Sequence, residues 1–256
     1  MRRGVPALVF LLGLIPAAGR AAVPPLTIMV EDASEPFSRR DGTGYANDIV
    51  RAAFLAAGVA VRLDVVPYAR CKKSLEDAAT PACFGMSWQP QFKNRIVFSD
   101  LPLFEVHADV YSRRAAKISG PQDLKPGSTL GIINGYEYPD AILALARRGV
   151  VLEGNVSEAA NLQMVAKGRL DAAVMMTSEI ENMPRRISWM GVENTVRLAF
   201  RGGLMKSYIG FSPANPRGEE ARRAFNRGYA IIIANRTRDR IHDAWMKKAY
   251  QIAPVP

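Results

Sequence analysis

The sequence has few of the residues that most often bind metals or act as nucleophiles. Its 256 residues include two histidines and two cysteines. His107 and His242 are far apart, and no cysteines or histidines have the spacing of a zinc site, so we expect no metal. Ser87 has a glycine two residues before it but none two residues after it, unlike a nucleophile elbow. The sequence also lacks a phosphate-loop lysine motif. We therefore expect a protein that is not an enzyme and has no cofactor.

The sequence also lacks a long apolar run after its first 22 residues. Arg2 and Arg3 precede an apolar run over residues 5–18, which small residues follow. A transmembrane helix needs about 20 apolar residues. The shorter pattern predicts a signal peptide over residues 1–22, cleaved near Ala21 or Ala22. A retained membrane anchor is the alternative. We expect the mature protein to lie in the periplasm.

The two cysteines, Cys71 and Cys83, are an even number in a chain predicted to be exported, which favours a disulfide. A predicted helix carries Cys71, and the strand that follows it carries Cys83. A helix folded back on the next strand can bring the two Cβ atoms together. Two unpaired buried thiols are the alternative.

Positive charge exceeds negative charge, with 34 Lys and Arg against 24 Asp and Glu. The basic residues occur as scattered pairs such as Arg147-Arg148 and Lys247-Lys248, without aromatic residues between them. A nucleic-acid interface concentrates such charge on one face. We therefore expect a solvated surface and no nucleic-acid partner, although attraction of small anionic ligands remains open.

Alternating strand and helix patterns predict an α/β fold with parallel pairing. In the first predicted helix, for example, apolar residues recur at helical spacing, and Gly58 ends the helix. The expected strands cover residues 26–30, 59–66, 83–87, 106–111, 129–133, 150–152, 172–176 and 208–212. The expected helices cover residues 47–57, 68–78, 140–148, 158–167, 218–235 and 237–250.

Several short motifs occur in a fixed order along residues 26–250. They are Pro36-Phe37, Gly42-x-Gly44-Tyr45-x-x-Asp48, Pro67-Tyr68-x-Arg70, Arg95-x-x-x-Phe98-Ser99, Asp123-Leu124 and Gly168-Arg169-Leu170-Asp171-Ala172. In this order and spacing the chain resembles the family 3 extracellular solute-binding proteins, the receptors of polar amino-acid ABC importers. The resemblance implies a type II periplasmic-binding-protein fold, in which two crossing strands join two α/β lobes around a ligand cleft.

The resemblance also implies how the chain is divided. Residues 23–112 and 208–256 would form the first lobe, and residues 117–203 the second. The hinge would lie near residues 111–116 and 204–209. Ligands of open α/β sheets bind beyond the carboxyl ends of the strands, which is where we expect the site.

The resemblance implies a set of residues that line the cleft: Glu31, Phe37, Tyr68, Arg70, Ser87, Trp88, Arg95, Tyr136, Glu137 and Met176. Arg95 would pair with a ligand carboxylate, because a guanidinium can make two parallel hydrogen bonds to it. Core packing is the alternative for Phe37 and Trp88, and a surface position is the alternative for Arg95 and Glu31. Arg70 could hold a second anionic group or brace the cleft.

Two positions depart from the family pattern. Tyr136 and Glu137 stand where small hydroxyl residues are usual, and Met176 stands where an acidic residue usually meets the ligand ammonium. Because an unpaired buried ammonium is costly, we expect another small polar carboxylate or a modified amino acid rather than a standard α-amino acid held in the usual way. As an alternative, Glu31 or Glu137 supplies the charge from another direction.

The family's role implies a monomeric periplasmic solute-binding protein. It would capture a small polar or anionic ligand by closing its lobes, and then dock on the membrane permease of an ABC importer. A lyase or dehydratase on the same fold, with Glu137 as the proton-transfer group, and a ligand-sensing subunit are the alternatives.

Overall fold

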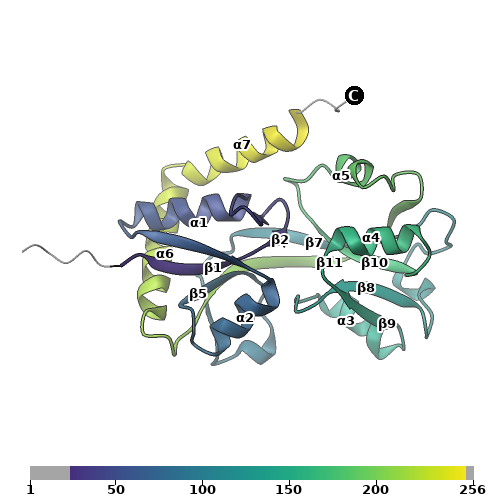
Figure 1. The fold of residues 1–256 in the computed structure, drawn as a ribbon, viewed down its shortest axis with the longest axis horizontal. Coiled ribbons are helices and arrows are strands. Elements are labelled where there is room, and N and C mark those ends of the chain that lie inside the picture. Colours follow the sequence, from purple (N-terminus) through teal and green to yellow (C-terminus); the bar gives the residue numbers. More distant parts are fainter. Residues whose placement is uncertain (1–23, 252–256) are drawn as a thin grey trace, which may run out of the picture.

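The computed structural model describes residues 24–251. The signal peptide predicted for residues 1–22 lies outside these residues. A nine-stranded mixed sheet runs through the molecule in the order β4-β1-β5-β11-β7-β10-β8-β9, and the short β6 (Val97–Phe98) pairs with β11. Two groups of helices lie toward opposite ends of this sheet (Figure 1). Over the described range, no helix combines the length and the apolar character needed to cross a membrane.

The first group is built around β1 (Leu26–Glu31), which pairs in parallel with β4 (Val61–Val66) and β5 (Ala82–Met86). Helix α1 (Tyr45–Ala56) buries its apolar residues at helical spacing. Helix α6 (Gly218–Ala234) packs against it. A Cβ atom at Gly228 of α6 would lie 1.8 Å from the Ala53 carbonyl oxygen, so only glycine allows this close approach.

The disulfide predicted between Cys71 and Cys83 is confirmed. It joins α2 (Tyr68–Glu76) to β5, with 5.8 Å between the two Cα atoms. Both residues are fully buried in a cluster that includes Leu75, Met86 and Phe92. The bond therefore fixes the first half of α2 beside the start of β5.

Replacing Cys71 and Cys83 together with serine is expected to lower the free energy of unfolding by about 3 kcal/mol, because the disulfide closes a short loop and restricts the unfolded chain. Denaturant unfolding of oxidised wild type and of the double variant measures the difference. Dithiothreitol should lower wild-type stability by a similar amount and leave the variant unchanged. Equal stability of the two proteins would contradict a structural role for the bond.

The second group contains the parallel strands β8 (Thr129–Ile133), β9 (Val151–Asn155) and β10 (Ala172–Thr177), of which β8 is central. Its helices are α3 (Asp140–Arg147), α4 (Glu158–Ala166) and α5 (Met183–Trp189). Two further apolar clusters form its core, one around Leu145 and Val174 and one around Leu162 and Met175.

Two long antiparallel strands connect the groups, β7 (Phe104–Arg113) and β11 (Val196–Phe211). β7 pairs with β10 over residues 107–112, and the end of β11 pairs with β5. The register of β11 shifts between Arg201 and Leu204, at Gly202-Gly203. We propose that the groups are the two lobes and that the chain crosses near residues 104–107 and 204–207. The segment 111–116, where we expected the first crossing, begins inside the second group.

The C-terminal helix α7 (Thr237–Gln251) spans both groups (Figure 1). The Trp245 indole N–H donates to Asp48 of α1 at 2.9 Å. The Tyr250 hydroxyl donates to the carbonyl oxygens of Glu179 and Glu181, which follow β10. The helix is therefore bonded to α1 through Trp245 and to the loop after β10 through His242 and Tyr250.

Most predicted elements are confirmed to within a few residues. The structure adds α5, the first twelve residues of β11, and a ribbon formed by β2 (Ala33–Ser34) and β3 (Ser38–Arg39). It also adds two short 3₁₀ turns, Pro90–Phe92 and Pro121–Asp123.

Candidate functional site

The carboxyl ends of β1 and β5 meet the loop between β8 and α3 around a small cavity. Its volume is about 40 Å³, well below the roughly 300–1,000 Å³ of a typical ligand pocket. Six of the ten expected residues line it: Glu31, Phe37, Ser87, Tyr136, Glu137 and Met176. The other lining residues are Ser34, Gly85, Phe104, Val106, Met205 and Ser207. Side chains from both proposed lobes therefore fill most of the space between them.

Glu31, the last residue of β1, is buried at one side of this cavity. Its carboxylate accepts a hydrogen bond from the Tyr136 hydroxyl. Burial raises the pKa of Glu31 from 4.5 to about 8, and the Glu158 carboxylate adds to the rise. No basic side chain among residues 24–251 forms an ion pair with it. Glu31 is thus a protonated acid at neutral pH, unless a cation enters the cavity.

Glu137 lies in the loop before α3 and reaches across to the first lobe. It accepts hydrogen bonds from the Tyr68 hydroxyl at 2.5 Å, the Lys72 ammonium at 3.0 Å and the Ser87 backbone N–H at 3.3 Å. Burial raises the pKa of Glu137, and the positive charge of Lys72 opposes the rise. These three donors form a carboxylate-binding set that the protein's own side chain occupies.

Lys72 was not among the expected site residues. Its ammonium also donates to the Gly135 carbonyl oxygen, so it holds the loop at two points. Tyr68 and Lys72 are four residues apart on α2, so they lie on one face of that helix. The spacing from the expected Tyr68 was the signal that could have identified Lys72.

Phe37 and Met176 have packing roles in the cavity wall. Phe37 stacks on Phe104, with 3.9 Å between the ring centroids and 12° between the planes. The Met176 side chain packs between the apolar clusters of both lobes. Its backbone N–H donates to the Glu158 carboxylate at 2.6 Å, which places an acid beside position 176.

Glu158 belongs to a second buried group of charges. Arg186 of α5 pairs with Glu158 at 2.8 Å and also with Glu181. Burial opposes the charge on Arg186, but the two carboxylates more than offset this and raise its pKa. The group fastens α5 and the loop after β10 to the start of α4.

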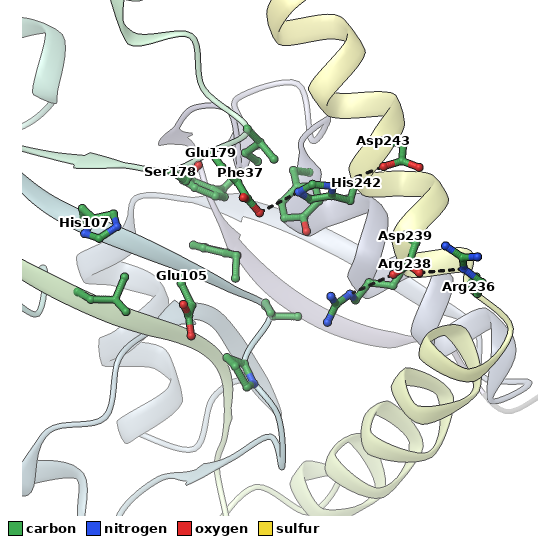
Figure 2. A pocket seen from close by; sticks show the side chains of 16 residues that line it. Phe37, Glu105, His107, Ser178, Glu179, Arg236, Arg238, Asp239, His242 and Asp243 are labelled. Carbon is green, nitrogen blue, oxygen red and sulfur yellow. Dashed lines mark hydrogen bonds and ion pairs between the residues drawn. The ribbon is translucent and has the colours of Figure 1, made fainter.

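A larger chamber of about 580 Å³ lies beside the cavity, under the start of α7 (Figure 2). Phe37 and Phe104 line both spaces, so their stacked rings form a common wall. Its charged residues pair mainly with one another: His242 is 3.0 Å from Glu179, and Arg236 is 3.2 Å from Asp239 (Figure 2). The chamber therefore has the larger volume, whereas Glu31, the acid without an ion-pair partner, lines the smaller cavity.

Four expected residues do not line the cavity. One of them, Tyr68, still donates to Glu137 from α2, and the other three lie farther away. Arg95, three residues after the 3₁₀ turn Pro90–Phe92, is 58% exposed and pairs with Glu76 at 3.6 Å. Trp88 is also exposed and lines a separate surface pocket. Arg70 is exposed on α2, two residues from the inward-facing Tyr68. Arg95 therefore lies away from this cavity, and its anchoring of a ligand carboxylate stays a prediction.

Comparisons with known proteins agree with this architecture. Residues 26–248 match the model for bacterial extracellular solute-binding proteins, family 3. No curated protein sequence matches significantly. One similar structure is ArtJ from Geobacillus stearothermophilus, an arginine-, lysine-, histidine-binding protein. It has a TM-score of 0.72 and 17% identity, over 90% of this chain and 97% of that one.

Two other similar structures are a sensor domain and a second amino acid-binding protein. A histidine kinase sensor domain has a TM-score of 0.71 and 19% identity, over 86% of this chain and 95% of that one. The ancestral amino acid-binding protein AncCDT-1, a precursor of cyclohexadienyl dehydratase, has a TM-score of 0.67 and 20% identity, over 87% and 96%. At these identities the likeness establishes the type II periplasmic-binding-protein fold, and it leaves the ligand open.

Proposed function

The chain belongs to the bacterial extracellular solute-binding proteins of family 3, and we propose that it captures a small amine-bearing solute in the periplasm for an ABC importer. The observation that carries this proposal is Glu31, a buried carboxylate on the cavity without a cationic partner among residues 24–251. An ammonium group there would pair with it and remove the penalty of burying an unpaired charge.

A carboxylate on the same ligand has a matching set of donors. The Tyr68 hydroxyl, the Lys72 ammonium and the Ser87 N–H already bind one carboxylate, that of Glu137. A ligand carboxylate that displaced Glu137 would meet three donors, one of them charged. This arrangement favours an amino acid or related compound whose ammonium group pairs with Glu31 and not with a residue at position 176.

Binding requires the lobes to separate and close again. The interlobe contacts made by Tyr136 and Glu137 leave only about 40 Å³, so a ligand must replace them with its own. It then shifts the population toward a closed form, because its contacts with both lobes exist only there. We propose that the monomer docks on the permease in this closed form.

The ligand class is tested first by a thermal-shift screen of amino acids, polyamines and small organic acids. A ligand present at about 100 times its dissociation constant stabilises the protein by about 2.7 kcal/mol. We expect hits among amino-bearing compounds. A screen in which only anions without an amino group stabilise the protein would contradict the role of Glu31.

Binding of the amine is expected to release close to one proton at pH 6.5. In the free protein the pKa of Glu31 is about 8, so the acid is protonated. A bound ammonium favours the ionised form and drives the proton off. At pH 8.5 about three quarters of the acid is already ionised, so the release should fall to about a quarter of a proton. Calorimetry in buffers with different ionisation enthalpies measures it.

The matched variant for this prediction is Glu31→Gln, which keeps the shape of the side chain and removes the titrating group. It should weaken binding by a hundredfold or more, as expected for a buried ion pair that loses one partner. Wild-type affinity in the variant, or wild-type binding with no proton release at pH 6.5, would contradict the assignment.

Proton transfer to a bound substrate is the second candidate function. It is supported by the same residue, because a buried acid with a raised pKa can donate a proton at neutral pH. In that case a compound found in the screen would be converted during long incubation, and Glu31→Gln would abolish the conversion. Mass spectrometry of the recovered compound distinguishes turnover from binding.

A further inference from the structure

A groove between α5 and α7 contains more positive than negative charge. It has a volume of about 210 Å³ and is lined by the cationic residues Arg39, Arg185, Arg186 and Lys248 and by the acidic residues Glu35 and Glu181. Arg186 is neutralised by its two buried carboxylates, and Arg39 lies 3.7 Å from Glu35. Within residues 24–251, Arg185 and Lys248 form no ion pair. Arg185 and Lys248 therefore account for the excess of positive over negative charge in the groove.

Two of the guanidinium groups also have an unused donor. The Nε atoms of Arg39 and Arg185 are buried and form no hydrogen bond within the described part of the chain. Because these Nε atoms are buried, an anion in the groove would bind the terminal Nη atoms of the same guanidinium groups. The two groups come from different elements, because Arg39 lies on β3 and Arg185 on α5, and both line the groove.

The groove also offers apolar surface next to these cations. Trp189 is 68% exposed, and the Arg185 guanidinium lies 4.3 Å from its ring centroid. Trp245 lies on the α7 side, with the Lys248 ammonium 4.4 Å from its ring centroid. Ile180 and Pro36 complete the lining. The volume is below the usual range for drug-sized ligands, so it suits a smaller molecule.

We propose that this groove binds a small carboxylate with a flat apolar body, at a site separate from the Glu31 cavity. The carboxylate lies among Arg39, Arg185 and Lys248, and the apolar body lies against Trp189 and Ile180. Because the walls belong to different proposed lobes, the bound anion favours the arrangement in which the lobes are together.

Tryptophan fluorescence can report on this groove directly. The chain has three tryptophans, and two of them line the groove. In a Trp88→Phe background both remaining indoles report on it. The probe is benzoate, and its neutral analogue benzamide is the control ligand. We expect a saturable change with benzoate, half-complete below about 1 mM, and at least tenfold weaker binding of benzamide.

Charge removal tests the assigned residues. Arg185→Gln with Lys248→Gln should weaken benzoate binding at least tenfold. The control pair Arg147→Gln with Lys167→Gln removes the same charge from exposed positions on the second lobe, and should leave binding unchanged. Circular dichroism verifies that both variants fold. Absence of saturation by 10 mM benzoate, equal binding of benzamide, or equal effects of the two variant pairs would each overturn the proposal. None of these outcomes involves Glu31, so the proposed function is tested separately.

Discussion

Replacing Arg186 with methionine is expected to lower the free energy of unfolding by about 3–5 kcal/mol. Arg186 is 18% exposed, and its partners Glu158 and Glu181 are 11% and 3% exposed. Without the guanidinium, Glu158 and Glu181 stay buried with no cation beside them. Burial already raises the pKa of Glu181 to about 8, so this acid must then take up a proton or remain an uncompensated charge, which is more costly than the loss of the ion pair itself. Denaturant unfolding followed by circular dichroism measures the change.

The matched control is Arg95→Met, because Arg95 forms an exposed ion pair with Glu76 and should contribute less than about 1 kcal/mol. The triple change Glu158→Gln, Glu181→Gln and Arg186→Met removes all three charges and should recover much of the loss. The loss from Arg186→Met should also be smaller at pH 5 than at pH 8, because burial raises the pKa of Glu181 to about 8 and this acid is protonated at pH 5. Equal effects of Arg186→Met and Arg95→Met would contradict this account.

Replacing Glu137 with alanine is expected to weaken the interaction between the two proposed lobes by about 2–5 kcal/mol. The Tyr68 hydroxyl and the Ser87 N–H are buried and would lose their acceptor, and Lys72 would keep only its bond to Gly135. We expect a larger radius of gyration in small-angle X-ray scattering and a lower melting temperature. Glu137→Gln keeps the shape without the charge and should have an intermediate effect.

Asp77→Ala is the control for Glu137→Ala. Asp77 pairs with Lys73 at 2.6 Å on the same helix as Lys72, but that pair is exposed. Its loss should change stability by less than about 1 kcal/mol and leave the scattering curve unchanged. If the scattering curve of Glu137→Ala also matched that of wild type, the contacts of the Glu137 loop would not be what holds the two proposed lobes together.

The regular elements could be predicted because their apolar residues follow one period over several turns or strand pairs. The first part of β11 escaped prediction because Gly202-Gly203 ends the short alternation of apolar residues at Val196, Leu198 and Phe200. Helix α5 escaped because it is only seven residues long and has Pro184 in its first turn. Pairing with β7 and the buried Arg186 stabilise these segments, and both are tertiary effects that a local pattern does not contain.

The candidate site was predictable where residues follow strand ends, as at Glu31 and Ser87. It was not predictable at Arg95, because the direction of that side chain depends on the turn before it. Nor could the sequence show that Glu137 would fill the donors expected for a ligand, because the partners are 50 to 69 residues apart in the chain. The family pattern predicted where the candidate site lies, but the contacts between the proposed lobes determine which side chains meet in it.

The glycine pair in β11 has a mechanical consequence. A Cβ atom at Gly202 would lie 2.5 Å from Ile142 and 2.8 Å from the Ala108 carbonyl oxygen, so this strand segment tolerates no larger residue there. A register shift at the same point interrupts the ladder between β11 and β7, and residues in such an irregularity lack regular partners. A second register shift lies between Leu198 and Phe200, so the sheet should flex across residues 198–204, with regularly hydrogen-bonded strands on either side. In amide hydrogen exchange, this segment should exchange earlier than the regularly paired residues that flank it.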